Sequence, residues 1–132
     1  TQDSSSAASD VYKRQVKERM DKFEASEKAT KRIKQALSRG DTAVVTAEAE
    51  LLVSWAREMD NYFPENSNQT PSEARDEIWL QWDDFIGAIQ SFNNASNALM
   101  DAAASEDPRA MRGAFKEMTK SCKSCHQKFR ED

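Results

Sequence analysis

The stretch IWLQWDDFIGAIQSFNNASNALMDAA, residues 78–103, decides the fold of this chain. Apolar or small side chains return in it every three or four residues, a spacing that lines them up along one side of a helix. They are Ile78, Trp82, Phe85, Ile89, Phe92, Ser96, Leu99 and Ala103. Such a seam, kept without a slip over about seven turns, is typical of a helix packed in a bundle.

The segment that follows repeats this stepping. Asp107 is a natural N-cap, and Pro108 suits the first helical position because it has no N–H to lose. The predicted buried positions of this fourth helix are Met111, Phe115, Met118, Cys122, Cys125 and Phe129.

Two more helices are predicted upstream, over residues 16–39 and 42–60. Gly40 is a natural helix stop between them, and Asp41 caps the second. Residues 61–71 are expected to form a loop that bridges bundle ends, with Tyr62 or Phe63 tucked onto the core. The expected buried positions are Val16, Met20, Phe23, Ala29, Ile33, Ala36 and Leu37 in the first helix and Val44, Val45, Leu51, Leu52, Trp55 and Met59 in the second.

The fold class that follows is all-α, an antiparallel up-down four-helix bundle. Only three Gly and three Pro occur among the 132 residues, and a chain of this length is expected to form one domain. Residues 1–10 are rich in Ser, Ala and Asp, and we expect residues 1–15 to be a polar tail, disordered or extraneous. Residues 16–132 form the predicted domain.

The residues that could bind a metal or react as thiols are concentrated in Cys122-Lys123-Ser124-Cys125-His126. This motif is the attachment signature of a c-type haem. The chain has two cysteines and one histidine, and all three lie in this motif. Thiols three residues apart can form thioethers with the two vinyl groups of one porphyrin, and the adjacent imidazole can bind the iron axially. The sequence therefore predicts one covalent haem c in the bundle.

A redox dithiol, a structural zinc site and a disulfide are alternative explanations of the motif. A redox dithiol usually opens a helix after a strand, and no strand pattern occurs here. A structural zinc site needs four ligands, and no second Cys or His pair exists. A disulfide between Cys122 and Cys125 has poor geometry within a helix. Chance occurrence remains the last alternative.

The chain resembles the cytochrome c′ family over about residues 16–130. The resemblance is carried by Phe63-Pro64 before a polar loop, by Glu77-Ile78-Trp79, by Phe85 and Phe115, and by the ending Ser-Cys-Lys-Ser-Cys-His-Gln-Lys-Phe-Arg. It implies that Cys122 and Cys125 hold the haem and that His126 is the proximal ligand. It also implies that Trp79 and Arg130 lie near the haem or its supporting shell.

The resemblance leaves two functions open. Low-spin members supply a methionine from the first helix and carry electrons, and counting back from the Gly40-Asp41 turn favours Met20, with Val16 and Phe23 on the same face. The main expectation is therefore an electron carrier with axial ligands His126 and Met20. The alternative is a high-spin, five-coordinate protein that binds nitric oxide or carbon monoxide. A haem-free bundle with a redox-active dithiol or a structural role is the third hypothesis.

One departure accompanies the assignment of Met20. Family members often carry an arginine one turn before the distal residue, facing a haem propionate. Val16 stands at that place when Met20 is distal, whereas Arg14 and Arg19 lie off-register.

Charge is unevenly distributed along a chain of net charge −4. Residues 65–107 hold nine acids and one base, whereas residues 109–130 hold seven bases and one acid. The basic face Arg109–Arg130 could dock an acidic redox partner, or simply be a solvated face that complements the helix dipole. No basic stripe with interleaved aromatics indicates nucleic-acid binding, and no apolar run is long enough for a membrane span.

Further expectations concern catalysis and cellular context. We expect no enzyme activity, because the chain lacks a second histidine for acid–base work and shows no paired carboxylates at a predicted cleft. Haem attachment by this motif occurs outside the bacterial cytoplasm, so we expect a periplasmic protein whose signal peptide precedes the given sequence. The resemblance also allows a homodimer through the first two helices, although the first is densely charged.

Overall fold

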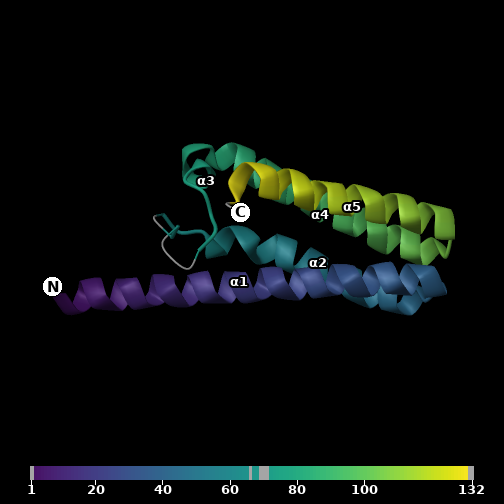
Figure 1. Ribbon diagram of the computed structural model, residues 1–132, viewed down its shortest axis with the longest axis horizontal. Coiled ribbons are helices and arrows are strands. Elements are labelled where there is room, and N and C mark those ends of the chain that lie inside the picture. The colour runs from purple at the N-terminus through teal and green to yellow at the C-terminus, as the bar shows by residue number, and fades with distance from the viewer. Residues whose placement is uncertain (1, 66, 69–71, 131–132) are drawn as a thin grey trace.

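The computed structural model describes residues 2–65, 67–68 and 72–130, and these are mainly helical (Figure 1). The helices are α1 (Gln2–Arg39), α2 (Thr42–Glu58), the short 3-10 helix η1 (Met59–Tyr62), α3 (Glu77–Leu80), α4 (Trp82–Ser105) and α5 (Pro108–Phe129). One isolated antiparallel bridge joins Ala74 to Arg130.

The four long helices form two antiparallel hairpins. Figure 1 shows α1 beside α2 and α4 beside α5, with the hairpins stacked and all four axes roughly aligned. The closest packing lies within each hairpin and between α2 and α4, whereas α1 and α5 touch only sparingly. The predicted all-α four-helix bundle is confirmed, and the loose α1–α5 boundary is where side chains leave space.

The turns between helices follow the predicted chemistry. Gly40 adopts φ 70°, the left-handed conformation that ends α1, and the Asp41 side chain accepts a hydrogen bond from Val44 N at 3.2 Å. At the other hairpin Asp107 accepts from Arg109 N at 3.0 Å, with Pro108 in the first turn of α5. The capping residues therefore fix where these helices begin and end.

Helix α1 differs from the expected segment at its start. The sequence predicts a helix start near Val16, whereas α1 begins at Gln2 and its first part runs past the end of α2 in Figure 1. The side chains of residues 10–14 are exposed, and from residue 10 onward the first buried side chain is that of Val16, which is 4% exposed. Residues 1–15 show no apolar periodicity that would predict a helix, and the division at residue 15 stays a prediction.

The predicted third helix is interrupted at Gln81. The backbone there leaves the helical region, with φ −126° and ψ 50°, and separates α3 from α4. Ile78 is buried and Trp82 half-buried on either side of the break, so the seam continues across it. No Gly or Pro marks the break, which is why the periodicity alone predicted one continuous helix.

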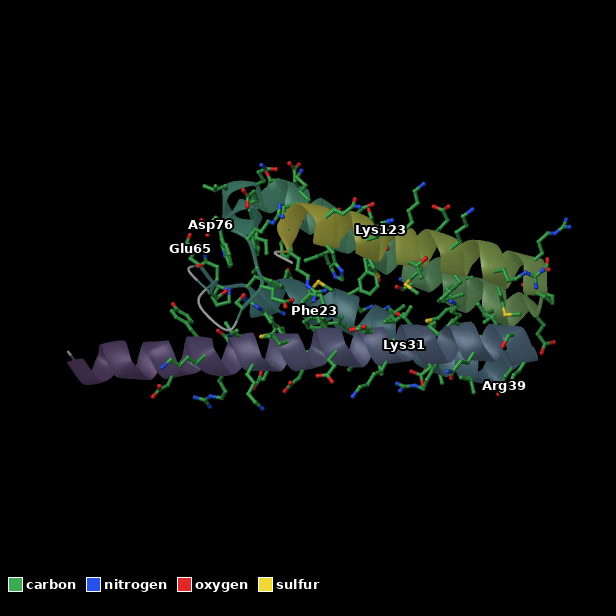
Figure 2. All side chains as sticks on the ribbon, in the orientation of Figure 1. Phe23, Lys31, Arg39, Glu65, Asp76 and Lys123 are labelled. Atoms are coloured by element: carbon green, nitrogen blue, oxygen red, sulfur yellow. The ribbon has the colours of Figure 1, made fainter. Side chains whose placement is uncertain are left out.

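The core changes character along the bundle. Near the Gly40 turn it consists of small and aliphatic residues such as Ala29, Ile33, Ala36, Ala49 and Leu99, all fully buried. At the other end it becomes aromatic, where Phe63 packs on Phe85 with ring centroids 4.8 Å apart and Phe85 on Phe129 at 5.3 Å. Figure 2 shows charged side chains such as those of Lys31 and Arg39 on the outside of α1.

Within the described residues, no helix combines the length and apolar character that crossing a bilayer requires.

Candidate functional site: a cavity lined by the cysteine–histidine motif

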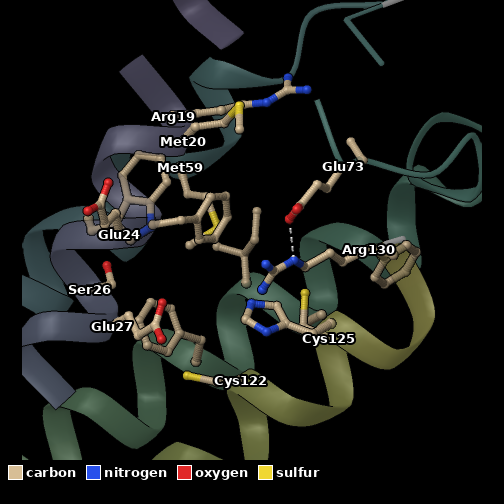
Figure 3. Close-up of a pocket in the computed structure, with 18 of the residues that line it drawn as sticks. Arg19, Met20, Glu24, Ser26, Glu27, Met59, Glu73, Cys122, Cys125 and Arg130 are labelled. Atoms are coloured by element: carbon tan, nitrogen blue, oxygen red, sulfur yellow. Dashed lines mark hydrogen bonds and ion pairs between the residues drawn. The ribbon is translucent and has the colours of Figure 1, made fainter. Parts of the chain in front are cut away.

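A cavity of about 760 Å³ lies between the two hairpins at the aromatic end of the bundle. α1, α2, α4 and α5 all contribute to its walls, and residues 72–74 of the loop before α3 contribute as well. Figure 3 shows α1 on one side and the cysteine-bearing turns of α5 on the other. Cavities of this size are typical of sites that enclose a cofactor or small ligand.

The two thiols lie one helical turn apart on α5, and both line this cavity. Both are free and half-buried. Burial raises the pKa of Cys122, and burial together with the neighbouring Cys122 raises the pKa of Cys125 to about 11. The site therefore presents two neutral thiols toward an apolar space.

His126 follows directly and faces α1 across the cavity. Its ring lies 6.2 Å, centroid to centroid, from the ring of Phe23, in an edge-to-face arrangement. Burial lowers the pKa of His126 and Arg130 lowers it further, whereas Glu27 and Glu73 act in the opposite direction. A neutral imidazole, the form that binds a metal, is thus favoured here.

These observations bear on the other readings of the motif. Reactive dithiols have lowered thiol pKa values, and here burial raises both. Within the described parts of the chain, no group of three His, Cys, Asp or Glu side chains could hold a metal ion directly. The geometry therefore favours neither a redox dithiol nor a zinc site.

Most of the residues that sequence reasoning singled out meet at this cavity. Its lining includes Cys122, Cys125, His126, Met20, Phe23 and Arg130. Val16 and Trp79 are not part of the lining. Val16 is buried one turn beyond the cavity, and Trp79 instead donates its indole N–H to the Phe63 carbonyl at 3.1 Å, which anchors the start of the loop before α3.

Met20 and Phe23 occupy different parts of the cavity. In Figure 3 Met20 is drawn beside Arg19, at the opposite end of the cavity from Cys122 and Cys125. Phe23, by contrast, contacts the imidazole of His126 and packs its ring on Trp55 at 5.3 Å. Of the two side chains, Phe23 is the one that faces His126.

Arg19 is a cavity residue that sequence reasoning missed, although its spacing of one helical turn from Phe23 was a signal. Only 2% of it is exposed, and burial lowers its pKa to about 10. Its guanidinium donates to the Tyr62 carbonyl at 2.9 Å, to Ser67 Oγ at 2.7 Å, to Ser72 Oγ at 2.6 Å and to the Ser67 carbonyl. Counted from Phe23 instead of Met20, Arg19 stands one turn earlier, at the position that the family often gives to an arginine.

Arg130 lies on the α5 side of the cavity. It pairs with Glu73 through Nε at 2.7 Å, and its backbone bridges to Ala74. The backbone N–H of Arg75 also donates to the Phe129 carbonyl at 2.9 Å. Ser67 and Ser72 are therefore held from α1 by Arg19, and Glu73 and Ala74 from α5 by Arg130.

The residues present suit a covalently attached haem. Two thiols one turn apart and an adjacent imidazole line one large cavity, whose remaining walls are mostly apolar or aromatic. With haem bound, Cys122 and Cys125 would hold the porphyrin edge and His126 the iron, from the α5 side.

Comparisons with known proteins match the chain to cytochromes. The profile of the family described as Cytochrome C' matches residues 14–130. Cytochrome c-554 of Cereibacter sphaeroides is 38% identical over 60 residues, which cover 46% of this chain and 39% of that protein. Cytochrome c' of Pararhodospirillum photometricum is 29% identical over 90 residues, covering 67% of this chain and 72% of that one. The chain thus spans less than half of the c-554 relative.

Solved structures match over nearly the whole fold. Cytochrome c' from Thermochromatium tepidum superposes with a TM-score of 0.84 at 25% identity, covering 92% of this chain and 97% of that one. Cytochrome c prime from Shewanella frigidimarina gives 0.84 at 26% identity with the same coverage. A nitric oxide complex of a mutant cytochrome c prime from Alcaligenes xylosoxidans gives 0.82 at 25% identity, covering 92% and 97%. Since the match spans both the bundle and the cysteine–histidine motif, this chain belongs to the cytochrome c′ family, and its cofactor is a covalent haem c held by its only two cysteines, Cys122 and Cys125.

Proposed function

We propose that this protein binds haem with a single protein ligand to the iron, His126. The face of the haem toward α1 is left free to bind a small gas such as nitric oxide or carbon monoxide. When bound, haem iron supplies either gas binding or one-electron exchange, depending on its sixth ligand. This proposal takes the alternative raised from the sequence in preference to electron transfer through a His126/Met20 pair.

The observation that carries the proposal is the contact between Phe23 and His126. A phenyl ring cannot coordinate iron, and it is this ring that lies 6.2 Å from the imidazole across the cavity. Trp55 and Phe63 pack edge-on against Phe23 with centroids at 5.3 and 6.3 Å, which restricts its movement. Met20 lies at the far end from the cysteines and is better suited to fill space there.

The comparisons add independent support. Mutants of a cytochrome c prime from Alcaligenes xylosoxidans are described with bound nitric oxide, one of them in the ferrous form. The relatives are named as cytochromes, and we propose no catalytic turnover for this chain.

The test compares two substitutions on the haem-loaded protein. Carbon monoxide is titrated into the ferrous form, and the spin state of the ferric form is read from visible and electron paramagnetic resonance spectra. We expect a high-spin ferric spectrum that Met20→Leu leaves unchanged, with a stability cost below about 1.5 kcal/mol for this volume-conserving change. Phe23→Leu should raise carbon monoxide affinity because a smaller side chain obstructs the ligand less.

A low-spin ferric spectrum that Met20→Leu converts to high-spin would overturn the proposal. That outcome would restore Met20 as the sixth ligand and electron transfer as the function. Loss of carbon monoxide binding in Phe23→Leu would contradict the role assigned to Phe23.

We also propose a redox partner surface on α5. Arg109, Arg112, Lys116, Lys120 and Lys123 are exposed at helical spacing, so they form one stripe, here called the α5 basic stripe. Within the described residues none of the five makes an ion pair, whereas Lys128 and Arg130 pair with Asp84 and Glu73. Unpaired cations beside the haem motif suit an acidic partner protein.

The cellular location is proposed to be the periplasm, as haem attachment by this motif implies. Fractionation of cells producing the full precursor should recover the haem protein there; haem-loaded protein found only in the cytoplasm would contradict this. Homodimerisation is a further proposal, prompted by a related cytochrome c' described as having a ligand-controlled dimer dissociation.

A further inference from the structure

Trp55 differs from the other tryptophans and the tyrosines of the chain because it lines the haem cavity. The chain has three tryptophans and two tyrosines, whose rings can each give up one electron, and Trp55 alone among these five belongs to the cavity lining. Its side chain is 3% exposed, and within the described residues its indole N–H has no hydrogen-bond partner. A buried donor left unpaired in a folded protein requires an explanation, and a redox role is one.

The ring of Trp55 continues the aromatic contacts of the site toward the surface. On one side it packs on Phe23 at 5.3 Å, and the Phe23 ring lies 6.2 Å from that of His126. On the other side it packs on Tyr62, the last residue of η1, with centroids 5.4 Å apart and planes at 66°. Tyr62 is half-buried. An unbroken series of ring contacts therefore leads from the iron ligand to solvent.

Trp55 and Tyr62 differ in where a proton can go. The phenol of a half-buried tyrosine can pass its proton to water, whereas the buried N–H of Trp55 faces no acceptor among the described residues. Lys22 adds to this difference, since its ammonium lies 5.7 Å from the centroid of the Trp55 ring and disfavours a positive charge there. An oxidised Trp55 would keep its proton and its charge, so the more stable end of the series is Tyr62.

We propose that Trp55 and Tyr62 form a relay that draws an oxidising equivalent away from the haem after the haem has reacted with a peroxide, of which hydrogen peroxide is the simplest. The relay protects the porphyrin from oxidation and requires no catalytic cycle. This inference rests on the proposed function, because a peroxide must reach an iron position without a protein ligand.

The relay moves one electron in two steps. Hydrogen peroxide takes two electrons from the haem when its O–O bond breaks, and both oxygens then reach the oxidation level of water. Trp55 returns one electron to the haem, and Tyr62 returns one electron to Trp55. The phenol proton of Tyr62 passes to solvent water, so Tyr62 becomes a neutral radical. At the end the haem lacks one electron, Tyr62 lacks one electron and one proton, and Trp55 is unchanged.

The experiment mixes the ferric haem-loaded protein with hydrogen peroxide. Freeze-quench electron paramagnetic resonance detects a tyrosyl radical, and the loss of the main haem absorption band measures destruction of the porphyrin. We expect a tyrosyl signal in the unmodified protein. Tyr62→Phe, which removes one hydroxyl and keeps the ring on Trp55, should lose this signal and bleach faster.

Tyr12→Phe is the matched control for the end of the relay. Tyr12 is the second of the two tyrosines, and it lies on α1 before the first buried residues of the bundle, 40% exposed. We expect this variant to keep both the tyrosyl signal and the bleaching rate of the unmodified protein.

Trp55→Phe tests the first step. Phenylalanine keeps an aromatic ring in the core but gives up an electron far less readily, so the tyrosyl signal should be lost although Tyr62 is present. Trp82→Phe is its control, because Trp82 also packs on a cavity residue, Phe85 at 5.5 Å, but is not part of the lining. Circular dichroism and carbon monoxide binding show whether each variant keeps its fold and its iron site, and Tyr62→Phe keeps the relay testable should Trp55→Phe fail to fold.

The outcomes separate the relay from the proposed function. Absence of a tyrosyl signal in the unmodified protein, its survival in Tyr62→Phe, or equal losses in Trp55→Phe and Trp82→Phe would overturn the relay, while carbon monoxide binding would still uphold the open position. Absence of carbon monoxide binding in the unmodified protein would overturn the proposed function and the relay with it.

Discussion

The two ends of the bundle are built in opposite ways. At the Gly40 end, Ala36, Val45, Ala49 and Leu99 are fully buried and the helices pack closely. At the other end the side chains are larger, yet they surround a cavity of about 760 Å³. Phe23, Phe63 and Phe85 all line this cavity and pack edge-to-face, Phe23 on Phe63 and Phe63 on Phe85.

The difference teaches which part of the molecule can stand alone. The Gly40 end is closely packed by protein side chains alone, and a left-handed glycine and an aspartate cap fix its turn. The cavity end holds two thiols, an imidazole and a buried arginine, groups that a pure packing core would avoid. We therefore expect changes at one end to act on stability and changes at the other to act on the cofactor.

The largest effect should come from removing haem attachment. In Cys122→Ala/Cys125→Ala we expect haem to be extracted by acid–acetone and the midpoint of thermal unfolding to fall, because a ligand bound only to the folded state stabilises it. Haem staining after denaturing electrophoresis and circular dichroism measure the two effects. Each single variant, which keeps one thiol, is the control and should retain haem; haem that resists extraction from the double variant would refute covalent attachment.

Leu99→Ala should act on stability alone. Leu99 is fully buried in the closely packed end, so its truncation should cost about 2–5 kcal/mol of unfolding free energy. Denaturant unfolding gives this value, and the haem spectrum should remain that of the unmodified protein. A spectral change comparable to that of Phe23→Leu would show that the two ends are not separable.

Arg19→Gln should loosen the attachment of Ser67 and Ser72 to α1. The guanidinium joins α1 to Tyr62, Ser67 and Ser72, and we expect its loss to cost about 2 kcal/mol, since several acceptors lose a charged donor. Denaturant unfolding and limited proteolysis are the measurements. Arg14→Gln, an exposed arginine on the same helix, is the control and should leave both unchanged. Equal losses in the two variants would contradict a clamping role.

The smallest effect concerns the α5 basic stripe. Lys116→Glu/Lys120→Glu should slow electron exchange with ferricyanide, an anionic probe, by about threefold at low salt, because charge steering weakens. The rates should converge at high ionic strength. Lys28→Glu/Lys34→Glu makes the same charge change on α1. An equal slowing in this variant would mean that net charge, and not the position of the charges on α5, controls the rate. Stopped-flow mixing measures both.

Local sequence patterns were enough to predict most of the fold. The helix starts at Thr42 and Pro108 were predictable because Asp41 and Asp107 cap them through their own side chains. The seam from Ile78 to Ala103 was found because burial follows helical spacing. Neither the α1 start at Gln2 nor the break at Gln81 has such a signature: no apolar pattern marks the first, and no glycine or proline marks the second.

The sequence by itself determined the cofactor chemistry, since two cysteines and one histidine in a five-residue motif need no partner elsewhere in the chain to be recognised. Only the tertiary structure decided what faces that motif. Met20 and Phe23 are both apolar residues of α1 with compatible spacing, and the choice between them depends on how α1 is rotated and shifted against α5. That register is set by distant contacts, among them Arg19 with Ser67 and Phe23 with Trp55, which helical periodicity cannot encode.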